Sequence, residues 1–201
     1  MRIVSTNSTA GAVRHAATHA SPGTFLRRRD FAGTDRAVES ALSRLSAEGE
    51  LIRVRRGLYW RGRQTRFGMT RPSPLEVALA VAGPGAGPSG VAAAHALGLT
   101  SQVPGTVEVA VPGKVPQGLP GVHYRSRPYG RRERALRPLE VAVLEVLRDP
   151  DVAEMPWPSA SARIDKLMDS GEVRREAVLA EAREESHRAA RSRAAALVGP
   201  A

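Results

Sequence analysis

A change of periodicity between residues 34 and 60 constrains the fold more than any other feature of this sequence. From Thr34 to Glu48, apolar residues recur at helical spacing and share one face. Gly49 is a typical helix stop. From Leu51 to Trp60 the pattern alternates, with a tight turn at Arg56-Gly57, as in a β-hairpin. The apolar residues of the helical face are Val38, Ala41, Leu42 and Leu45.

The segments before this helix predict shorter elements. Ser8 to Ala20 is expected to be a short helix with a thin apolar stripe, which is ended by the turn residues Ser21-Pro22-Gly23. Thr24 to Leu26 is expected to be a very short strand, and Arg27 to Ala32 one or two helical turns with Phe31 pointing inward. The order helix, strand, short helix, longer helix and hairpin is the layout of a winged helix-turn-helix. We therefore expect such a domain over residues 1–68.

The remainder of the chain predicts a second, different domain. The polar segment from Arg61 to Pro74 contains two prolines and is expected to be a linker. A mixed domain of helices and a small sheet is expected over residues 72–201, which makes the whole chain α+β. Its last predicted helix is charged on most faces and is expected to pack only lightly. The predicted helices are 75–82, 91–97, 139–148, 159–170 and 174–196, with a loop at 83–90 and strands at 106–111 and 122–125.

Composition excludes several classes of protein. The chain has 201 residues and no cysteine, which excludes a disulfide framework and a thiolate zinc or iron–sulfur site. No apolar stretch reaches the roughly 18–20 residues of a membrane helix. The first fifteen residues lack the apolar middle region of a signal peptide. We expect a cytoplasmic protein that does not interact with a membrane.

The positive charge is concentrated in the first third of the chain. The net charge is +10, and residues 1–70 contain thirteen arginines but only five acidic residues. Residues 71–201 are nearly balanced, with seventeen basic and fifteen acidic residues. A basic block on a folded domain is typical of a protein that binds a polyanion.

The helix from Thr34 to Glu48 is expected to carry the groups that read DNA. The major groove is about 12 Å wide and admits one α-helix, on which an arginine can bind the O6 and N7 atoms of guanine. The hairpin is expected to place Arg53 and Arg55 on one face and Arg56 at its tip, suited to phosphates or the minor groove. The partner is therefore predicted to be double-stranded DNA. The predicted DNA-binding residues are Arg27, Arg28, Thr34, Arg36, Ser40, Ser43, Arg44, Arg53, Arg55 and Arg56.

The run AVESALSRLSAEGELIRVRRGLYW resembles the N-terminal winged helix of AbiEi-type antitoxins of type IV toxin–antitoxin systems. The later runs SPLEVALAVA, SGVAAAHALGLTSQVP and TVEVAVPG are similar to the opening of that family's C-terminal domain. The resemblance implies a repressor that binds inverted repeats in its own promoter and neutralises a nucleotidyltransferase-like toxin encoded beside it. It implies DNA contacts by Arg36, Arg44, Arg53, Arg55 and Arg56, and assigns no antitoxic residue.

Other motifs predict no catalytic, metal or cofactor site, so we expect no enzyme. The run from Gly85 to Gly90 fits G-x-G-x-x-G but lacks the strand and helix context of a nucleotide-binding unit. His15 and His19 share a helical face without a third metal ligand nearby. Trp157 is expected to anchor the core or a loop. A second basic cluster is either a solvated loop or an added DNA-backbone contact, and comprises Arg125, Arg127, Arg131 and Arg132.

Two other functions remain open at this point. The chain can be a stand-alone regulator whose C-terminal domain binds a ligand or dimerises. It can also be an enzyme in which the winged helix only positions a catalytic domain, although the sequence lacks a catalytic constellation. The identity of the neighbouring gene distinguishes the antitoxin from the stand-alone regulator.

Overall fold

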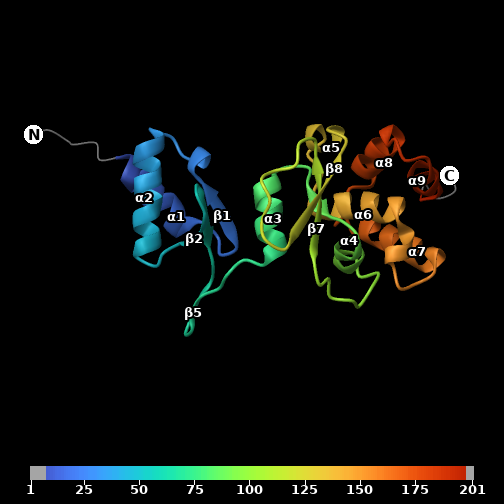
Figure 1. Cartoon of the computed structure of the whole chain (residues 1–201), viewed down its shortest axis with the longest axis horizontal. Helices are drawn as coiled ribbons and strands as arrows, with labels where there is room; N and C mark the ends of the chain where they lie inside the picture. Colours follow the sequence, from blue (N-terminus) through green and yellow to red (C-terminus); the bar gives the residue numbers. More distant parts are fainter. Residues whose placement is uncertain (1–7, 198–201) are drawn as a thin grey trace, which may run out of the picture. The chain divides into compact units, whose positions relative to one another are not determined.

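The computed structural model describes residues 8–197, and its α+β fold divides into two compact units (Figure 1). Unit 1 ends at Ser73 and unit 2 begins at Pro74. Residues 1–7, on which the signal-peptide prediction partly rests, lie outside the described residues. None of the helices in the described range is long and apolar enough to cross a membrane.

Unit 1 has the predicted order of helix, strand, short helix, longer helix and hairpin. Its sheet is antiparallel with the strand order β1-β3-β2, so the hairpin returns through the middle of the sheet. This is the topology of a winged helix. The elements are α1 (Thr9–His19), β1 (Thr24–Arg27), the 3-10 turn η1 (Arg28–Asp30), α2 (Asp35–Ala47), β2 (Ile52–Arg55), β3 (Leu58–Arg61), β4 (Gln64–Thr65) and β5 (Gly68–Met69).

The core of unit 1 lies between the two long helices and one face of the sheet. Helix α1 contributes Val13 and Ala17, and Phe31 packs against the cluster from its edge, as predicted. The four apolar residues that predicted α2 are all buried, which confirms this element. The remaining buried members come from the strands and the segment before β2: Leu26, Leu51 and Tyr59.

The predicted linker contains structure that the sequence pattern did not indicate. Strands β4 and β5 pair as a short antiparallel hairpin, with Gln64 opposite Met69 and Thr65 opposite Gly68. Only the few residues after it connect the units. The prediction of a plain linker over Arg61–Pro74 is therefore wrong, because side-chain and backbone hydrogen bonds within a few residues are enough to form a two-residue turn.

Unit 2 combines a small mixed sheet with helices. Strand β7 is antiparallel to β6 and parallel to β8. The elements are α3 (Pro74–Ala82), β6 (Gly87–Pro88), α4 (Val91–Ala96), β7 (Val107–Pro112), β8 (Val122–Arg127), α5 (Gly130–Glu133), α6 (Pro138–Arg148), the 3-10 turn η2 (Pro150–Val152), α7 (Trp157–Asp169), α8 (Arg175–Glu184) and α9 (Arg188–Ala196).

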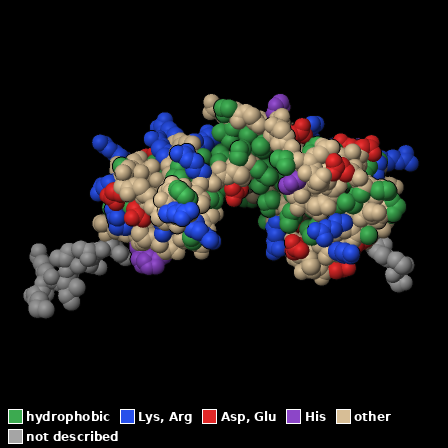
Figure 2. Space-filling model, turned by 90° about the horizontal axis from the view of Figure 1, so that it is seen from below, with side chains coloured by type: hydrophobic (Ala, Val, Ile, Leu, Met, Phe, Trp, Pro, Cys, Tyr) green, Lys and Arg blue, Asp and Glu red, His purple; other side chains and the backbone are tan. Residues whose placement is uncertain are grey.

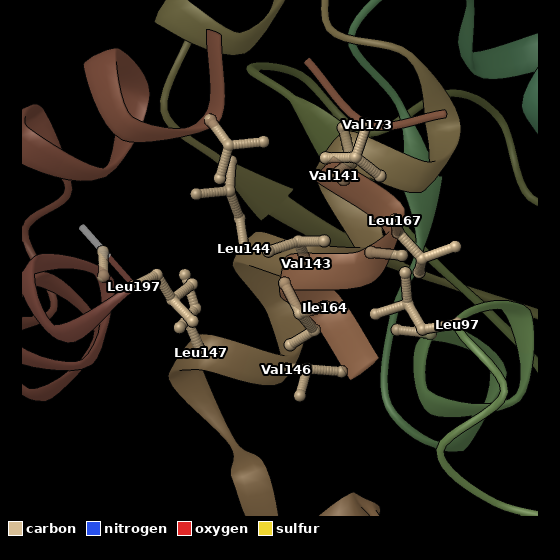
Figure 3. Close-up of a cluster of buried hydrophobic side chains, with 14 of the residues drawn as sticks. Leu97, Val141, Val143, Leu144, Val146, Leu147, Ile164, Leu167, Val173 and Leu197 are labelled. Atoms are coloured by element: carbon tan, nitrogen blue, oxygen red, sulfur yellow. The ribbon is translucent and has the colours of Figure 1, made fainter. Parts of the chain in front are cut away.

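Helix α6 forms the centre of unit 2. Every residue from Glu140 to Leu147 is buried, and α4, α7, α8 and α9 contribute to the same apolar cluster. Figure 3 shows side chains of α6 meeting those of α7 and Leu197 within this cluster. Trp157 packs against the cluster at its margin, which agrees with its predicted role as an anchor. A second, smaller cluster lies between α3 and the sheet.

The end of the chain differs from the prediction. The expected helix over 174–196 is two helices, because Glu185 leaves the helical conformation and His187 accepts a hydrogen bond from the Ala190 amide at the start of α9. These helices do not pack lightly. Val178 and Ala182 of α8, and Leu197 directly after α9, are buried in the core of unit 2. The buried residues of α9 itself are alanines, which pack against the core although many charged residues flank them.

Candidate nucleic-acid interface

Helix α2 presents a polar row to solvent because its apolar residues all lie on the opposite side. The Thr34 hydroxyl accepts a hydrogen bond from the Ala37 amide at 3.4 Å, so this predicted site residue caps the helix. Arg36, Ser40 and Arg44 follow at intervals of four residues, and all three are exposed. At about 1.5 Å per residue the row is about 12 Å long. That length matches three to four base pairs at about 3.4 Å each.

Tyr59 fixes the orientation of this helix on the sheet. Its buried hydroxyl lies 3.0 Å from Ser43 Oγ and donates to Glu39 Oε1 at 3.0 Å. Burial raises the pKa of Tyr59 above its ordinary value of 10.0, so the phenol keeps its proton to higher pH than an exposed tyrosine does. Ser43 was predicted to face the DNA groove, but it is half-buried and supports α2 from the sheet side. Tyr59 is the last residue of the Arg56-Gly57-Leu58-Tyr59 run, which gives this short motif a structural role.

The wing, which comprises β2, β3 and the turn between them, differs from its prediction in one respect. Arg53 pairs with Tyr59 and Arg55 pairs with Leu58, so Val54 forms a β-bulge. Because Tyr59 and Leu58 point to opposite faces of the sheet, Arg53 and Arg55 do so too. The prediction that both lie on one face is wrong. Arg53 lies on the α2 side, with its Nη2 3.8 Å from the Glu39 carboxylate.

A crevice separates the start of α2 from the wing turn. Arg28 forms an ion pair with Asp35 across its edge. Arg27 lies on β1 opposite Leu58, and its amide donates to Asp30 at 2.7 Å. Within residues 8–197, no carboxylate pairs with Arg36, Arg44 or Arg56, so the guanidinium groups of Arg36 and Arg56 at the crevice, and that of Arg44 further along α2, are available to an anion. The lining residues are Arg28, Asp35, Arg36, Glu39, Arg56 and Gly57.

Most of unit 1, from within α1 onward, lies within a region shared with other proteins. The model of a protein family, described as Family of unknown function (DUF6088), matches residues 15–115, which is half of the chain. The chain belongs to this family. The matched region runs from within α1 to just beyond β7 and includes α2 and the whole wing.

Other comparisons with known proteins are weaker. No curated protein matches this DUF6088 member. Among solved structures it is similar to one titled "Crystal structure of RV2827C protein from Mycobacterium tuberculosis", with 17% sequence identity and a TM-score of 0.45. The similarity covers 93% of this chain and 74% of that one.

Two arginines of the second basic cluster of this DUF6088 protein turn into the interior of unit 2. Arg131 is completely buried and forms ion pairs with Glu145 at 2.7 Å and Glu185 at 3.1 Å. Arg127 also binds Glu145, at 2.7 Å. These arginines neutralise buried carboxylates, and the alternative of an added DNA-backbone contact is therefore wrong for both. A charge run cannot show from sequence alone which of its members turn inward.

The two other members of this cluster have partners as well. Arg125 forms a bidentate pair with Glu108, with distances of 3.0–3.2 Å. Arg132 donates to the Ala82 carbonyl oxygen at 3.3 Å. These contacts give Arg125 and Arg132 partners within unit 2, and an added DNA-backbone contact by them stays a prediction.

The remaining motifs have structural roles. A Cβ at Gly85 would lie 2.6 Å from the Arg131 carbonyl oxygen, and one at Gly87 would lie 2.4 Å from Val141 Cβ. The glycines of the G-x-G-x-x-G run therefore allow close approach of α5 and α6. His15 and His19 stack with ring centroids 4.0 Å apart. No group of three or more potential metal ligands occurs among residues 8–197.

Proposed function

We propose that this protein is a sequence-specific DNA-binding repressor that acts on its own promoter. The observation that carries the proposal is the exposed row of Arg36, Ser40 and Arg44 on α2, beside the wing. A winged helix with an unpaired basic row on this helix has the form and charge needed to enter a major groove.

The geometry supports a division between base and phosphate contacts. Arg36 and Arg44, two turns apart on α2, can each donate two hydrogen bonds to a guanine, and Ser40 between them can bind either a base or a phosphate. Arg56 at the wing turn and Arg28 beside the crevice suit the phosphates that flank the groove. Tyr59 keeps the row aligned with the wing by holding α2 to the sheet.

The surface charge of unit 1 supports the same partner. Figure 2 shows basic side chains, all of them arginines, distributed over the visible surface of the N-terminal unit. Residues 1–70 have eight more basic than acidic residues. Such a surplus attracts phosphate over distances of about a Debye length, roughly 10 Å at 0.1 M salt, before specific contacts form.

The test is binding to the DNA upstream of the gene, measured by fluorescence anisotropy with an unrelated duplex for comparison. Each of Arg36→Ala and Arg44→Ala is expected to weaken specific binding by about 1–3 kcal/mol. The matched control is Arg183→Ala combined with Arg188→Ala, which removes two exposed arginines from unit 2. Equal affinity of wild type for both duplexes, or unchanged affinity in both α2 variants, would contradict the proposal.

We further propose that the protein is the antitoxin of a nucleotidyltransferase-like toxin. This proposal rests on the resemblance of the sequence to AbiEi-type antitoxins, and on unit 2, whose near-balanced charge does not favour a polyanion. The full chain with Arg36→Ala and Arg44→Ala should still rescue growth when the neighbouring toxin is expressed. The antitoxin role would be rejected if the neighbouring gene were not toxic, or if the variant that no longer binds DNA also failed to rescue growth. The DNA-binding role would survive either result.

A further inference from the structure

The β4–β5 hairpin holds two unusual residues at its tip in a fixed turn. Arg66 and Phe67 are the central residues between the paired Thr65 and Gly68. The Thr65 hydroxyl donates to the Gly68 carbonyl oxygen at 2.7 Å and accepts from the Phe67 amide at 3.1 Å. Gly68 has φ +100°, a conformation that favours glycine. The tip is therefore held in one conformation by its own residues.

The base of the hairpin is attached to the sheet of unit 1. Trp60 Nε1 donates to the Thr70 carbonyl oxygen at 2.7 Å, and Arg63 and Thr70 exchange two further hydrogen bonds, both of 2.9 Å. A Cβ at Gly62 would lie 2.1 Å from the same Thr70 oxygen, so the backbone is closely packed there. The hairpin thus continues from β3 as a projecting arm (Figure 1).

The stability of the fold does not account for the exposed tip. Phe67 is 85% exposed, whereas Phe25 and Phe31 are half-buried. A single exposed apolar side chain is common on protein surfaces, but this ring stands on an ordered turn with arginines beside it, and that combination suits the binding of a polyanion. The Arg66 guanidinium lies over the Phe67 ring, 4.6 Å from its centroid. Arginine and aromatic ring therefore form one compact, amphipathic tip.

The charge around the tip favours a polyanion over a protein partner. Residues 61–71 contain four arginines and no acidic residue. Arg63 and Arg66 are exposed, and in the described part of the chain neither pairs with a carboxylate. The apolar surface is a single ring flanked by charge and glycine, not a contiguous patch of the kind that protein interfaces use. Basic residues beside one apolar wedge are typical of arms that enter the minor groove of DNA.

We propose that the β4–β5 hairpin is a second DNA-contacting element, in which Phe67 wedges into the minor groove while Arg63 and Arg66 contact phosphates. The inference rests on the proposed DNA-binding function and extends it. The hairpin follows the end of β3 that is opposite to the wing turn. Its contacts would therefore fall on a different stretch of duplex from those of the wing and would lengthen the bound site.

The test compares two duplexes that share one bound sequence. The short duplex covers only the region protected in a variant that lacks all three proposed contacts, Arg63→Ala with Arg66→Ala and Phe67→Ala, and the long duplex extends on both sides. Each phosphate contact contributes about 0.9 to the slope of log K against log salt, which is about eightfold in affinity at 0.1 M salt. Arg63→Ala and Arg66→Ala should each show this loss on the long duplex and none on the short one. The control pair Arg183→Ala and Arg188→Ala should change neither.

The wedge itself is tested by the shape of the DNA. Wild type should bring the ends of the long duplex closer together, as measured by energy transfer between dyes at the two ends. Phe67→Ala should abolish this change and Phe67→Leu should retain part of it, with unchanged thermal unfolding showing that both variants fold.

Equal losses of affinity on the short and long duplexes, or no loss on either, would overturn the proposal. A hairpin variant that alters the molar mass in solution but not DNA affinity would instead assign the tip to self-association. Failure of wild type to bind any duplex would reject the proposed function at the first step.

Discussion

Removal of a single hydroxyl, in Tyr59→Phe, tests the link between the core of unit 1 and its candidate DNA surface. The Tyr59 hydroxyl contacts Ser43 and donates to the Glu39 carboxylate, both at 3.0 Å. A hydrogen bond to a charged group contributes about 1.5–3 kcal/mol, and one between neutral groups about 0.5–1.5 kcal/mol. Glu39 is partly exposed and has Arg53 nearby, so it regains some solvation in the variant. We expect a loss of about 2 kcal/mol in the free energy of unfolding of unit 1.

Hydrogen exchange of the α2 amides measures this loss separately from the stability of unit 2. A loss of about 2 kcal/mol should speed the exchange of the most protected α2 amides by about 30-fold. Specific DNA affinity should fall more than non-specific affinity, because the phosphate contacts do not require the alignment of the Arg36 row. The matched control is Tyr129→Phe, which removes a hydroxyl from a residue that is 53% exposed. If Tyr59→Phe and Tyr129→Phe had the same effect on amide exchange and on specific DNA affinity, the Tyr59 hydroxyl would not be responsible for positioning α2.

Three further predictions concern the buried charges and the wing. Arg131→Met should lower the free energy of unfolding of unit 2 by about 3–5 kcal/mol, because two buried carboxylates lose a partner, while DNA affinity measured under folding conditions stays unchanged; the reverse outcome would return Arg131 to the DNA surface. Burial alone would raise the pKa of Glu145, but the hydrogen bond from Arg127 and the charge of Arg131 outweigh it, and the pKa is lowered from 4.5. Its contribution is therefore present above about pH 4.5 and lost as the pH falls through the folded-state value, so Glu145→Gln should flatten the decline in unit 2 stability in acid unfolding curves; an unchanged decline would contradict this. Arg56→Ala should lower the slope of log K against log salt by about 0.9 for every DNA sequence, and a slope equal to that of wild type would show that the wing turn does not touch phosphate.

High pH provides a separate check on the Tyr59 contact. Burial raises the pKa of Tyr59 above its ordinary value of 10.0. The stabilisation is therefore complete below about pH 10 and is lost as the pH rises through the folded-state value, because the unfolded chain releases the proton first. Wild type should lose more stability than Tyr59→Phe over this range, as measured by urea unfolding. Parallel curves would show that the phenol is not held in a proton-dependent contact.

Local patterns predicted the helix of the candidate interface well. Its N-cap, its apolar face and its glycine stop all lie within sixteen residues, and each acts on the backbone next to it. The predicted strands of the wing were also correct, because alternation and the Arg-Gly turn are local signals. What the pattern did not predict is the bulge at Val54, which depends on pairing with Leu58 and Tyr59 across the hairpin.

Long-range partners explain the other errors. Arg127 and Arg131 belong to a basic run in the sequence, but their carboxylate partners Glu145 and Glu185 lie far along the chain. Ser43 sits at the edge of the polar face of α2 and turns inward because Tyr59 reaches it from β3. The R-G-x-Y run was the one sequence feature that pointed to Tyr59 as a residue that holds α2 to the sheet. An aromatic residue in a strand is equally typical of an ordinary core, so the run alone did not predict this role.

Selection of bound DNA from a random duplex library tests the central claim most directly. The full chain is used without any assumption about its operator, and the bound pool is sequenced after several rounds. The proposed function predicts enrichment of one short motif, with guanines about three to four base pairs apart where Arg36 and Arg44 reach the groove. Arg36→Ala and Arg44→Ala should each erase one of these guanines and leave the other. A pool that stays random at a salt concentration where wild type still binds would contradict sequence-specific recognition by α2.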